Sequence, residues 1–322
     1  MIDFRKVKLN GRYAYLDGHY FFFNGGSGFA FKMKGNGFSI SFDSSPVDGY
    51  FYVIVDRDYK NKIKYSTKEA LDFTFSKPGT HYVDVVKGNE SNDNVLKLLN
   101  IDVEGDVLDY DFVYKKRVRV FGDSTIAGFG ILEHTGSGSI ENSDSVEDFC
   151  YQALYEMSVD VDMFSASGWG LAFSIYTCPN RIGIIDFIDK VAVNKSNDWV
   201  DNSKYDLLII SLGTNDNSFI QQNPALKEER LIEYINKYKL LIDHEIKINK
   251  DIKILMVYGT LNEGEEAYKV SEETYKALKP NYKNLYVYKF NGDNSAISNH
   301  AYITAHKRMA EELKTVIKEL FD

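Results

Sequence analysis

The chain has 322 residues, which is long for one ordinary domain and short for three, so we expect two domains. Hydrophobic residues make up 44% of the sequence and charged residues 26%, as in globular proteins that bury substantial cores. The formal net charge is −9 and no basic stretch is concentrated anywhere, which disfavours nucleic acid as a partner and favours a neutral substrate.

The cysteines and the beginning of the chain predict a cytoplasmic protein. Cys150 and Cys178 lack the spacing of metal ligands and fit buried thiols in a reducing compartment better than a disulfide framework. The first residues are charged, and no run of about 18 apolar residues could span a membrane. A mature chain from which a leader had been removed would begin in the same way.

Residues 1–112 are predicted to form an all-β domain. Aromatic residues crowd this part of the chain, and they suit strands and shallow sugar-binding surfaces, although packing alone explains most of them. Residues 29–34, 38–42 and 50–56 indicate separate short strands, and residues 38–42 alternate apolar with polar side chains. This series, without long helical patterns, favours a β-sandwich of the jelly-roll type.

Residues 113–322 have a different pattern, in which strands and helices alternate. Residues 206–212 are almost wholly apolar, as expected of a parallel strand that is covered on both faces. Residues 228–247 and 306–320 carry apolar side chains at helical spacing. We therefore predict an α/β domain of three layers with a parallel sheet.

Three loops at the carboxyl ends of the predicted strands carry polar residues, and ligands of open α/β sheets bind at that edge. Ser124 follows Gly122 on a tight strand-to-helix turn, which suits a nucleophile, although such a turn is common without any function. Gly168 could direct its N–H at an oxyanion, with a plain turn as the alternative. The carboxamide of Asn215 is a suitable oxyanion donor, with a helix cap as the alternative.

A serine nucleophile needs a base within hydrogen-bond reach, and histidine is the usual one. Of six histidines, His300 is the best candidate because it directly precedes the last predicted helix. His306 lies inside that helix, where a packed or capping role is expected. His134 follows the nucleophile turn in a glycine-rich loop, and a substrate contact there has no support from the sequence.

Taken together and in this order, the four blocks around Ser124, Gly168, Asn215 and His300 resemble those of the SGNH (GDSL-like) hydrolases. The resemblance implies that Ser124 is the nucleophile and His300 the general base. It also implies an oxyanion hole made by the N–H groups of Ser124 and Gly168 and the side chain of Asn215. No metal or organic cofactor is implied.

Over nearly the whole chain the sequence is similar to carbohydrate esterase family 2, the acetyl-xylan-type esterases. The similarity includes residues 48–56, 81–90, 165–170 and 300–313. It implies a jelly-roll domain followed by an SGNH hydrolase domain, and removal of O-acetyl groups from plant polysaccharides or oligosaccharides. Trp169 could stack against a sugar ring, and a packing role is an equal alternative for it.

The block around His300 departs from the family pattern. Members often carry Asp two residues before the histidine, where this chain has Ser298. The carboxylate that usually orients the imidazole is therefore absent from its expected position, and Asp293 could replace it only if its loop folds back. Because some relatives work as Ser–His dyads with a backbone carbonyl on the ring, we expect a dyad and an active enzyme, with activity that is reduced.

Two other functions compete with acetyl ester hydrolysis. A carbohydrate-binding protein with a decayed catalytic site is suggested by the altered residues around His300, but the retained serine, glycine, asparagine and histidine argue against it. An esterase acting on lipid or thioester acyl chains is the other, and the lack of a membrane-binding apolar segment disfavours it.

Overall fold

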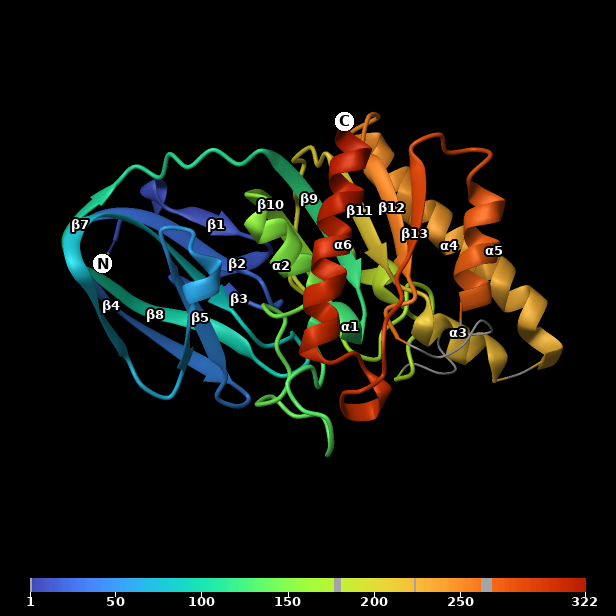
Figure 1. The fold of residues 1–322 in the computed structure, drawn as a ribbon, viewed down its shortest axis with the longest axis horizontal. Coiled ribbons are helices and arrows are strands. Elements are labelled where there is room, and N and C mark those ends of the chain that lie inside the picture. Colours follow the sequence, from blue (N-terminus) through green and yellow to red (C-terminus); the bar gives the residue numbers. More distant parts are fainter. Residues whose placement is uncertain (1, 177–180, 223, 262–267) are drawn as a thin grey trace.

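The computed structural model describes residues 2–176, 181–222, 224–261 and 268–322. Within them, an eight-stranded antiparallel sheet lies beside a five-stranded parallel sheet, and helices pack against the parallel sheet (Figure 1). The antiparallel sheet ends with β8 at Leu108, and the parallel sheet begins with β9 at Lys116. The predicted combination of an all-β domain with a parallel α/β domain is confirmed.

The antiparallel sheet contains three strands that are much longer than the others. Its strands are β1 (Lys8–Asn10), β2 (Tyr13–Leu16), β3 (His19–Phe22), β4 (Gly28–Ser45), β5 (Tyr50–Val55), β6 (Ile63–Ser66), β7 (Leu71–Lys87) and β8 (Val95–Leu108). They are arranged in the order β2-β3-β8-β4-β7-β5-β6, and β1 also pairs with β4. The sequence predicts separate strands at residues 29–34 and 38–42, whereas the structure joins them in β4.

A bulge in β4 explains both the length of this strand and its sequence pattern. The register of its pairing shifts between Gly35 and Gly37. The side chains of β4 that belong to the core of this sheet occupy odd positions before the bulge, such as Met33, and even positions after it, such as Phe38. Because strand side chains alternate with a period of two, the shift keeps both halves of β4 facing one core.

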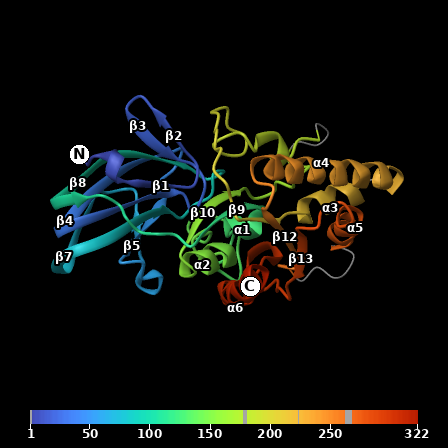
Figure 2. The same ribbon diagram turned by 90° about the horizontal axis from the view of Figure 1, so that it is seen from above.

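The parallel sheet has helices on both faces. Its strands are β9 (Lys116–Gly122), β10 (Val159–Ser165), β11 (Leu207–Ser211), β12 (Lys253–Tyr258) and β13 (Leu285–Lys289), in the order β10-β9-β11-β12-β13. The helices are α1 (Ser124–Ala127), α2 (Phe149–Glu156), α3 (Thr214–Gln221), α4 (Lys227–Ile248), α5 (Lys269–Leu278) and α6 (Ile303–Phe321). Figure 2 shows α2 and α6 on one side of the sheet and α4 on the other.

The position of β11 in the sheet explains why its sequence is continuously apolar. Leu207 and Ile209 belong to the core under α2 and α6, whereas Leu208 and Ile210 belong to the core under α4. All four side chains are fully buried, as the two-sided covering of a central parallel strand requires. The predicted three-layer arrangement is confirmed.

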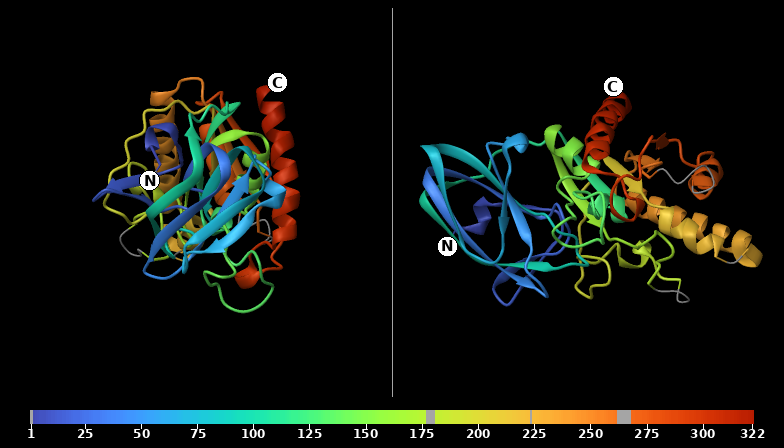
Figure 3. Two further views of the ribbon diagram at one scale, coloured as in Figure 1. Left: turned by 90° about the vertical axis from the view of Figure 1, so that its left-hand side faces the viewer. Right: turned by 60° about the horizontal axis from the view of Figure 1, so that its bottom comes forward.

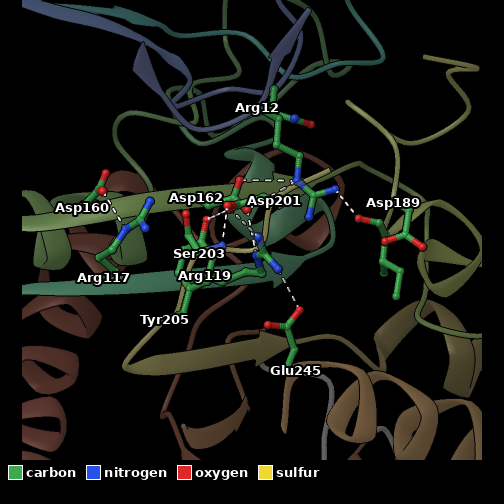
Figure 4. A network of polar contacts seen from close by, with 12 residues as sticks. Arg12, Arg117, Arg119, Asp160, Asp162, Asp189, Asp201, Ser203, Tyr205 and Glu245 are labelled. Carbon is green, nitrogen blue, oxygen red and sulfur yellow. Dashed lines mark hydrogen bonds and ion pairs between the residues drawn. The ribbon is translucent and has the colours of Figure 1, made fainter. Parts of the chain in front are cut away.

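A buried arginine between β1 and β2 connects the antiparallel part of the chain to the parallel sheet (Figure 4). Arg12 donates hydrogen bonds of 2.7 Å to the backbone carbonyls of Ile188 and Lys190 and lies 3.4 Å from Asp162 on β10. Asp162 also pairs with Arg119 of β9 at 2.8 Å. Because breaking a buried ion pair is strongly destabilising, this network ties the antiparallel sheet to β9 and β10.

The structure also bears on the predictions made from the cysteines and from hydropathy. Cys150 is fully buried in α2, while Cys178 lies outside the described residues. No helix in the described part of the chain is long and apolar enough to cross a membrane. In that same part, no three His, Cys, Asp or Glu side chains are grouped as metal ligands.

Candidate active site

The turn between β9 and α1 carries Ser124, the predicted nucleophile. The carboxylate of Asp123 caps α1 by accepting a hydrogen bond from the N–H of Thr125 at 3.0 Å. At Gly122, an added Cβ would lie 2.2 Å from the side chain of Ile126, so the chain needs glycine to turn this closely. Ser124 thus begins the helix at the carboxyl end of a central strand, at the edge that Figure 3 (right) brings forward.

The predicted base lies in direct contact with this serine. Nε2 of His300 is 2.7 Å from Oγ of Ser124, and Nδ1 of His300 is 3.2 Å from the backbone carbonyls of both Ile297 and Ser298. Because carbonyl oxygens only accept hydrogen bonds, Nδ1 carries the proton and Nε2 presents its lone pair to the serine hydroxyl. The positive φ angles of Ser298 (54°) and Asn299 (60°) form the turn that brings these carbonyls under the ring.

Asp293 has other hydrogen-bond partners. Its Oδ1 accepts from the backbone N–H of Tyr302 at 3.2 Å and from the hydroxyl of Ser295 at the same distance. Among the described residues, no carboxylate is hydrogen-bonded to His300. The ring is therefore oriented by its own backbone.

The surroundings of His300 keep its imidazole neutral. Burial lowers the pKa of His300 below the usual value of 6.5, and the two backbone carbonyls counteract this in part. The ring of Phe129, with its centroid 5.0 Å from that of the imidazole, covers one side. A neutral histidine beside a serine hydroxyl can accept the serine proton.

The loop after β10 carries Gly168 next to this pair. Ser165, at the end of β10, pairs with Gly122 at the end of β9, so the two loops leave the sheet as neighbours. Gly168 has a φ of +78°, and a Cβ added there would lie 2.5 Å from the ring of Tyr176. Glycine is required at this position both by the backbone conformation and by the ring that covers it.

Asn215 lies in the third loop, at the beginning of α3. Ser211, at the end of β11, also pairs with Gly122, which places this loop on the other side of the serine turn. Nδ2 of Asn215 donates to the backbone carbonyl of Trp169 at 3.3 Å. The structure thus brings the loops of all four predicted residues to one edge of the sheet.

Asp216 is a residue of this site that the sequence analysis missed. Its buried carboxylate accepts hydrogen bonds of 2.8–2.9 Å from the N–H groups of Leu171, Ala172 and Phe173. Burial raises its pKa to about 6, although these three donors oppose the shift. Its position next to Asn215 is the only signal in the sequence that points to Asp216. Its role could not be predicted, because its hydrogen-bond partners lie more than 40 residues away in the chain. Asp216 holds the loop that follows Gly168.

Trp169 has the contacts of a packing residue. It is only 4% exposed, and its ring meets that of Phe187 edge-on at 5.6 Å. The structure supports the packing alternative over the stacking of a sugar on this ring. The exposed aromatic ring of this loop is Tyr176, which is 63% exposed and was not predicted.

His306 caps α2 instead of approaching Ser124. Its Nδ1 accepts from the backbone N–H of Phe149 at 3.2 Å, and burial lowers its pKa to about 3. Since the folded-state pKa is depressed, the stability that the neutral ring provides is complete above pH 6.5 and is lost as the pH falls toward 3.

We expect His306→Gln, which retains a hydrogen-bond acceptor, to remove this acid sensitivity. By pH 5 the wild type should lose about 2 kcal/mol that the variant does not lose. Urea unfolding of both proteins at pH 7.5 and pH 5 measures the difference, and comparing the two proteins cancels the titration of all other groups. An identical pH dependence would contradict this role for the ring.

The chain was compared with protein families and with solved structures. Residues 9–109 match the family model of the carbohydrate esterase 2 N-terminal domain. A family two carbohydrate esterase from Clostridium thermocellum, solved with cellohexaose, superposes with a TM-score of 0.84 at 21% identity, over 97% of this chain and 98% of that chain. No curated protein matches.

Two further structures have the same arrangement. A family two carbohydrate esterase from Cellvibrio japonicus has a TM-score of 0.80 at 20% identity, over 98% of this chain and 95% of that one. An acetyl xylan esterase from Butyrivibrio proteoclasticus has a TM-score of 0.83 at 16% identity, over 99% and 96%. The resemblance is thereby confirmed: residues 9–109 match the N-terminal domain of carbohydrate esterase family 2, and the chain as a whole has the fold of that family's enzymes.

Proposed function

We propose that the protein is a serine esterase that removes O-acetyl groups from acetylated plant polysaccharides or oligosaccharides of the xylan or mannan type. The observation that carries the proposal is the 2.7 Å contact between Oγ of Ser124 and Nε2 of His300, whose Nδ1 proton faces two backbone carbonyls. The match of residues 9–109 to a carbohydrate esterase domain supports the substrate class.

In the reaction that we propose, Ser124 attacks the carbonyl carbon of the acetyl ester while His300 takes its proton. The negative charge that develops on the carbonyl oxygen is received by the N–H groups of Ser124 and Gly168 and by the side chain of Asn215. His300 then protonates the departing sugar hydroxyl, which leaves an acetylated Ser124. Water attacks this ester with His300 again as base, and acetate is released.

The two backbone carbonyls replace the carboxylate of a full triad. They hold the ring in the tautomer that the reaction requires, as a carboxylate would. They carry only partial negative charge, so they stabilise the imidazolium less in the transition state. We therefore expect a working dyad whose kcat is lower than that of an enzyme with a complete triad.

The substrate is expected to be a neutral acetylated sugar. The net charge of −9 favours neutral over anionic ligands, and no metal is required to activate the nucleophile. If the protein acts in the cytoplasm, as its sequence predicts, it acts on oligosaccharides.

Hydrolysis of p-nitrophenyl acetate, acetylated xylan and acetylated mannan by the purified protein tests the proposal, with acetate release as the measurement. Long-chain p-nitrophenyl esters and acyl thioesters, assayed alongside, test the lipid and thioester alternative. Inactivity on every acyl ester would refute an esterase, and retained carbohydrate binding would then favour the decayed-site alternative.

The acid limb of the pH profile is expected to follow His300. Only the neutral ring accepts the serine proton, so kcat/KM should rise with pH and level off above the pKa of the free enzyme. Because burial lowers this pKa, the midpoint should lie below 6.5. Initial rates on p-nitrophenyl acetate between pH 4.5 and pH 8 measure it, after incubation controls for stability. A midpoint clearly above 6.5 would contradict the assignment of His300.

A further inference from the structure

Two side chains from the antiparallel part of the chain are hydrogen-bonded to the loop that carries Gly168. Oε2 of Glu90 accepts a hydrogen bond from the N–H of Ser167 at 2.7 Å. Nδ2 of Asn92 donates to the carbonyl oxygen of Ser167 at 3.1 Å. Both side chains come from the connection between β7 and β8, so one short segment holds both backbone polar groups of Ser167.

Glu90 also determines the orientation of the Asn92 amide. Nδ2 of Asn92 donates to Oε2 of Glu90 at 3.2 Å as well as to the Ser167 carbonyl. Both neighbours are acceptors, so the NH₂ end of the amide must face them and the flipped amide is excluded. A carboxylate, an amide and a peptide carbonyl are thus connected in series.

The peptide unit at the end of this series includes the N–H of Gly168. The carbonyl of Ser167 and the N–H of Gly168 belong to one planar trans peptide and therefore point in opposite directions. A donor that holds the carbonyl oxygen on one side fixes the direction of the N–H on the other. Donation to the carbonyl also polarises the peptide and makes its N–H a stronger donor.

We propose that Asn92, oriented by Glu90, is a positioning residue that aims and polarises the Gly168 N–H toward the oxyanion. This inference rests on the proposed esterase function. It assigns part of the support of the oxyanion hole to residues of the N-terminal, antiparallel part of the chain.

The surroundings of Glu90 fit such a role. Its side chain is only 3% exposed, and burial together with nearby Asp93 raises its pKa to about 7. Buried Lys87 donates to the backbone carbonyl of Glu90 at 3.0 Å and partly offsets its charge. A buried carboxylate is unfavourable for folding unless its partners compensate, and such groups concentrate at functional sites.

An oxyanion donor acts on the transition state, so its loss should lower kcat with little change in KM. Asn92 is exposed, and its replacement should leave the fold intact. We expect Asn92→Ala to lower kcat on p-nitrophenyl acetate about tenfold, which is less than the loss of a whole oxyanion donor. Asn92→Asp should lower it further, because a carboxylate would face the Ser167 carbonyl and Glu90.

Asn36→Ala is the matched control. Asn36 is also exposed, lies in β4 of the antiparallel part of the chain, and donates its amide to a glutamate, Glu104, at the same distance of 3.2 Å. Among the described residues, its amide has no hydrogen bond to the loop that carries Gly168, so the kcat of Asn36→Ala should equal that of the wild type. Thermal unfolding of all variants separates a positioning effect from a loss of folded protein, and Asn92→Asp provides a second test if the alanine variant is unstable.

The rate at which a fluorophosphonate labels Ser124 is measured beside turnover, since its phosphoryl oxygen enters the same oxyanion hole. Slower turnover and slower labelling in both Asn92 variants, with Asn36→Ala unchanged, would support the proposal. Wild-type rates in folded Asn92→Ala and Asn92→Asp would overturn it while leaving the esterase intact. A wild type that neither hydrolyses an ester nor is labelled would instead refute the esterase, and this inference with it.

Discussion

Ser124→Ala is expected to abolish ester hydrolysis, with kcat reduced by at least about 10⁴-fold. The variant lacks the atom that forms the acetyl-enzyme, while His300 and the oxyanion donors remain in place. Ser124 is only half-buried, and in the part of the chain that the structure describes its hydroxyl is hydrogen-bonded only to His300, so the fold should tolerate alanine. Residual hydrolysis would reflect the oxyanion hole and substrate binding without a nucleophile.

Steady-state assays on p-nitrophenyl acetate and acetylated xylan measure this loss, and circular dichroism verifies the fold. Ser218→Ala is a suitable control, because Ser218 lies exposed on α3 and its hydroxyl donates to the backbone carbonyl of Thr214 in its own helix. Wild-type turnover in the Ser124 variant would require another nucleophile. If the variant keeps every measurable function of the protein, a carbohydrate-binding role replaces the enzymatic one.

Asp216→Ala should cause the largest loss of stability among single changes at this edge of the sheet. Three buried N–H groups, those of Leu171, Ala172 and Phe173, would lose their acceptor. An unsatisfied buried donor costs about 1–3 kcal/mol, and the relief of burying a carboxylate offsets part of the sum, so we expect about 3 kcal/mol. The loop that carries Gly168 would also lose its anchor, and kcat should fall.

Urea unfolding at pH 7.5 measures the change in free energy. Asp216→Asn provides the graded control, because its remaining oxygen can still accept from Ala172 and Phe173, whereas its NH₂ group would face the Leu171 donor. The expected order of stability is wild type, then the asparagine variant, then the alanine variant. An alanine variant as stable as the wild type would mean that water replaces the carboxylate.

Much of the fold was predictable because it depends on local sequence patterns. The continuous apolar run of β11 predicts a parallel strand covered on both faces, and its alternate residues do face two cores. Strand β4 was not predicted as one element. Its bulge contains Gly35 and Gly37, which lie between the two short strands that the sequence predicts. The strand continues through these glycines because both halves pair with β7 and β8.

In the candidate site, too, some residues could be predicted from the sequence and others could not. The order of the glycine, serine, asparagine and histidine blocks allowed Ser124 and His300 to be named from the sequence, and their roles remain predictions. The partners that hold the site were not predictable: Asp216, Glu90 and Asn92 act on residues 43–77 positions away. Such contacts depend on how loops from different strands meet, and a single sequence does not encode them in any local pattern.

The orientation of His300 by its own backbone has a consequence for mutational robustness. A carboxylate that orients a histidine can be lost through one amino-acid replacement, whereas a backbone carbonyl remains whatever side chain stands at Ile297 or Ser298. What the orientation of the ring requires at these positions is therefore a backbone conformation and not a particular side chain. Residues that tolerate a left-handed turn at 298 and 299 are suited to it, and β-branched residues are not. Most single substitutions in this loop should therefore leave the acceptors of the Nδ1 proton, and with them the ability of the imidazole to act as a base, unchanged.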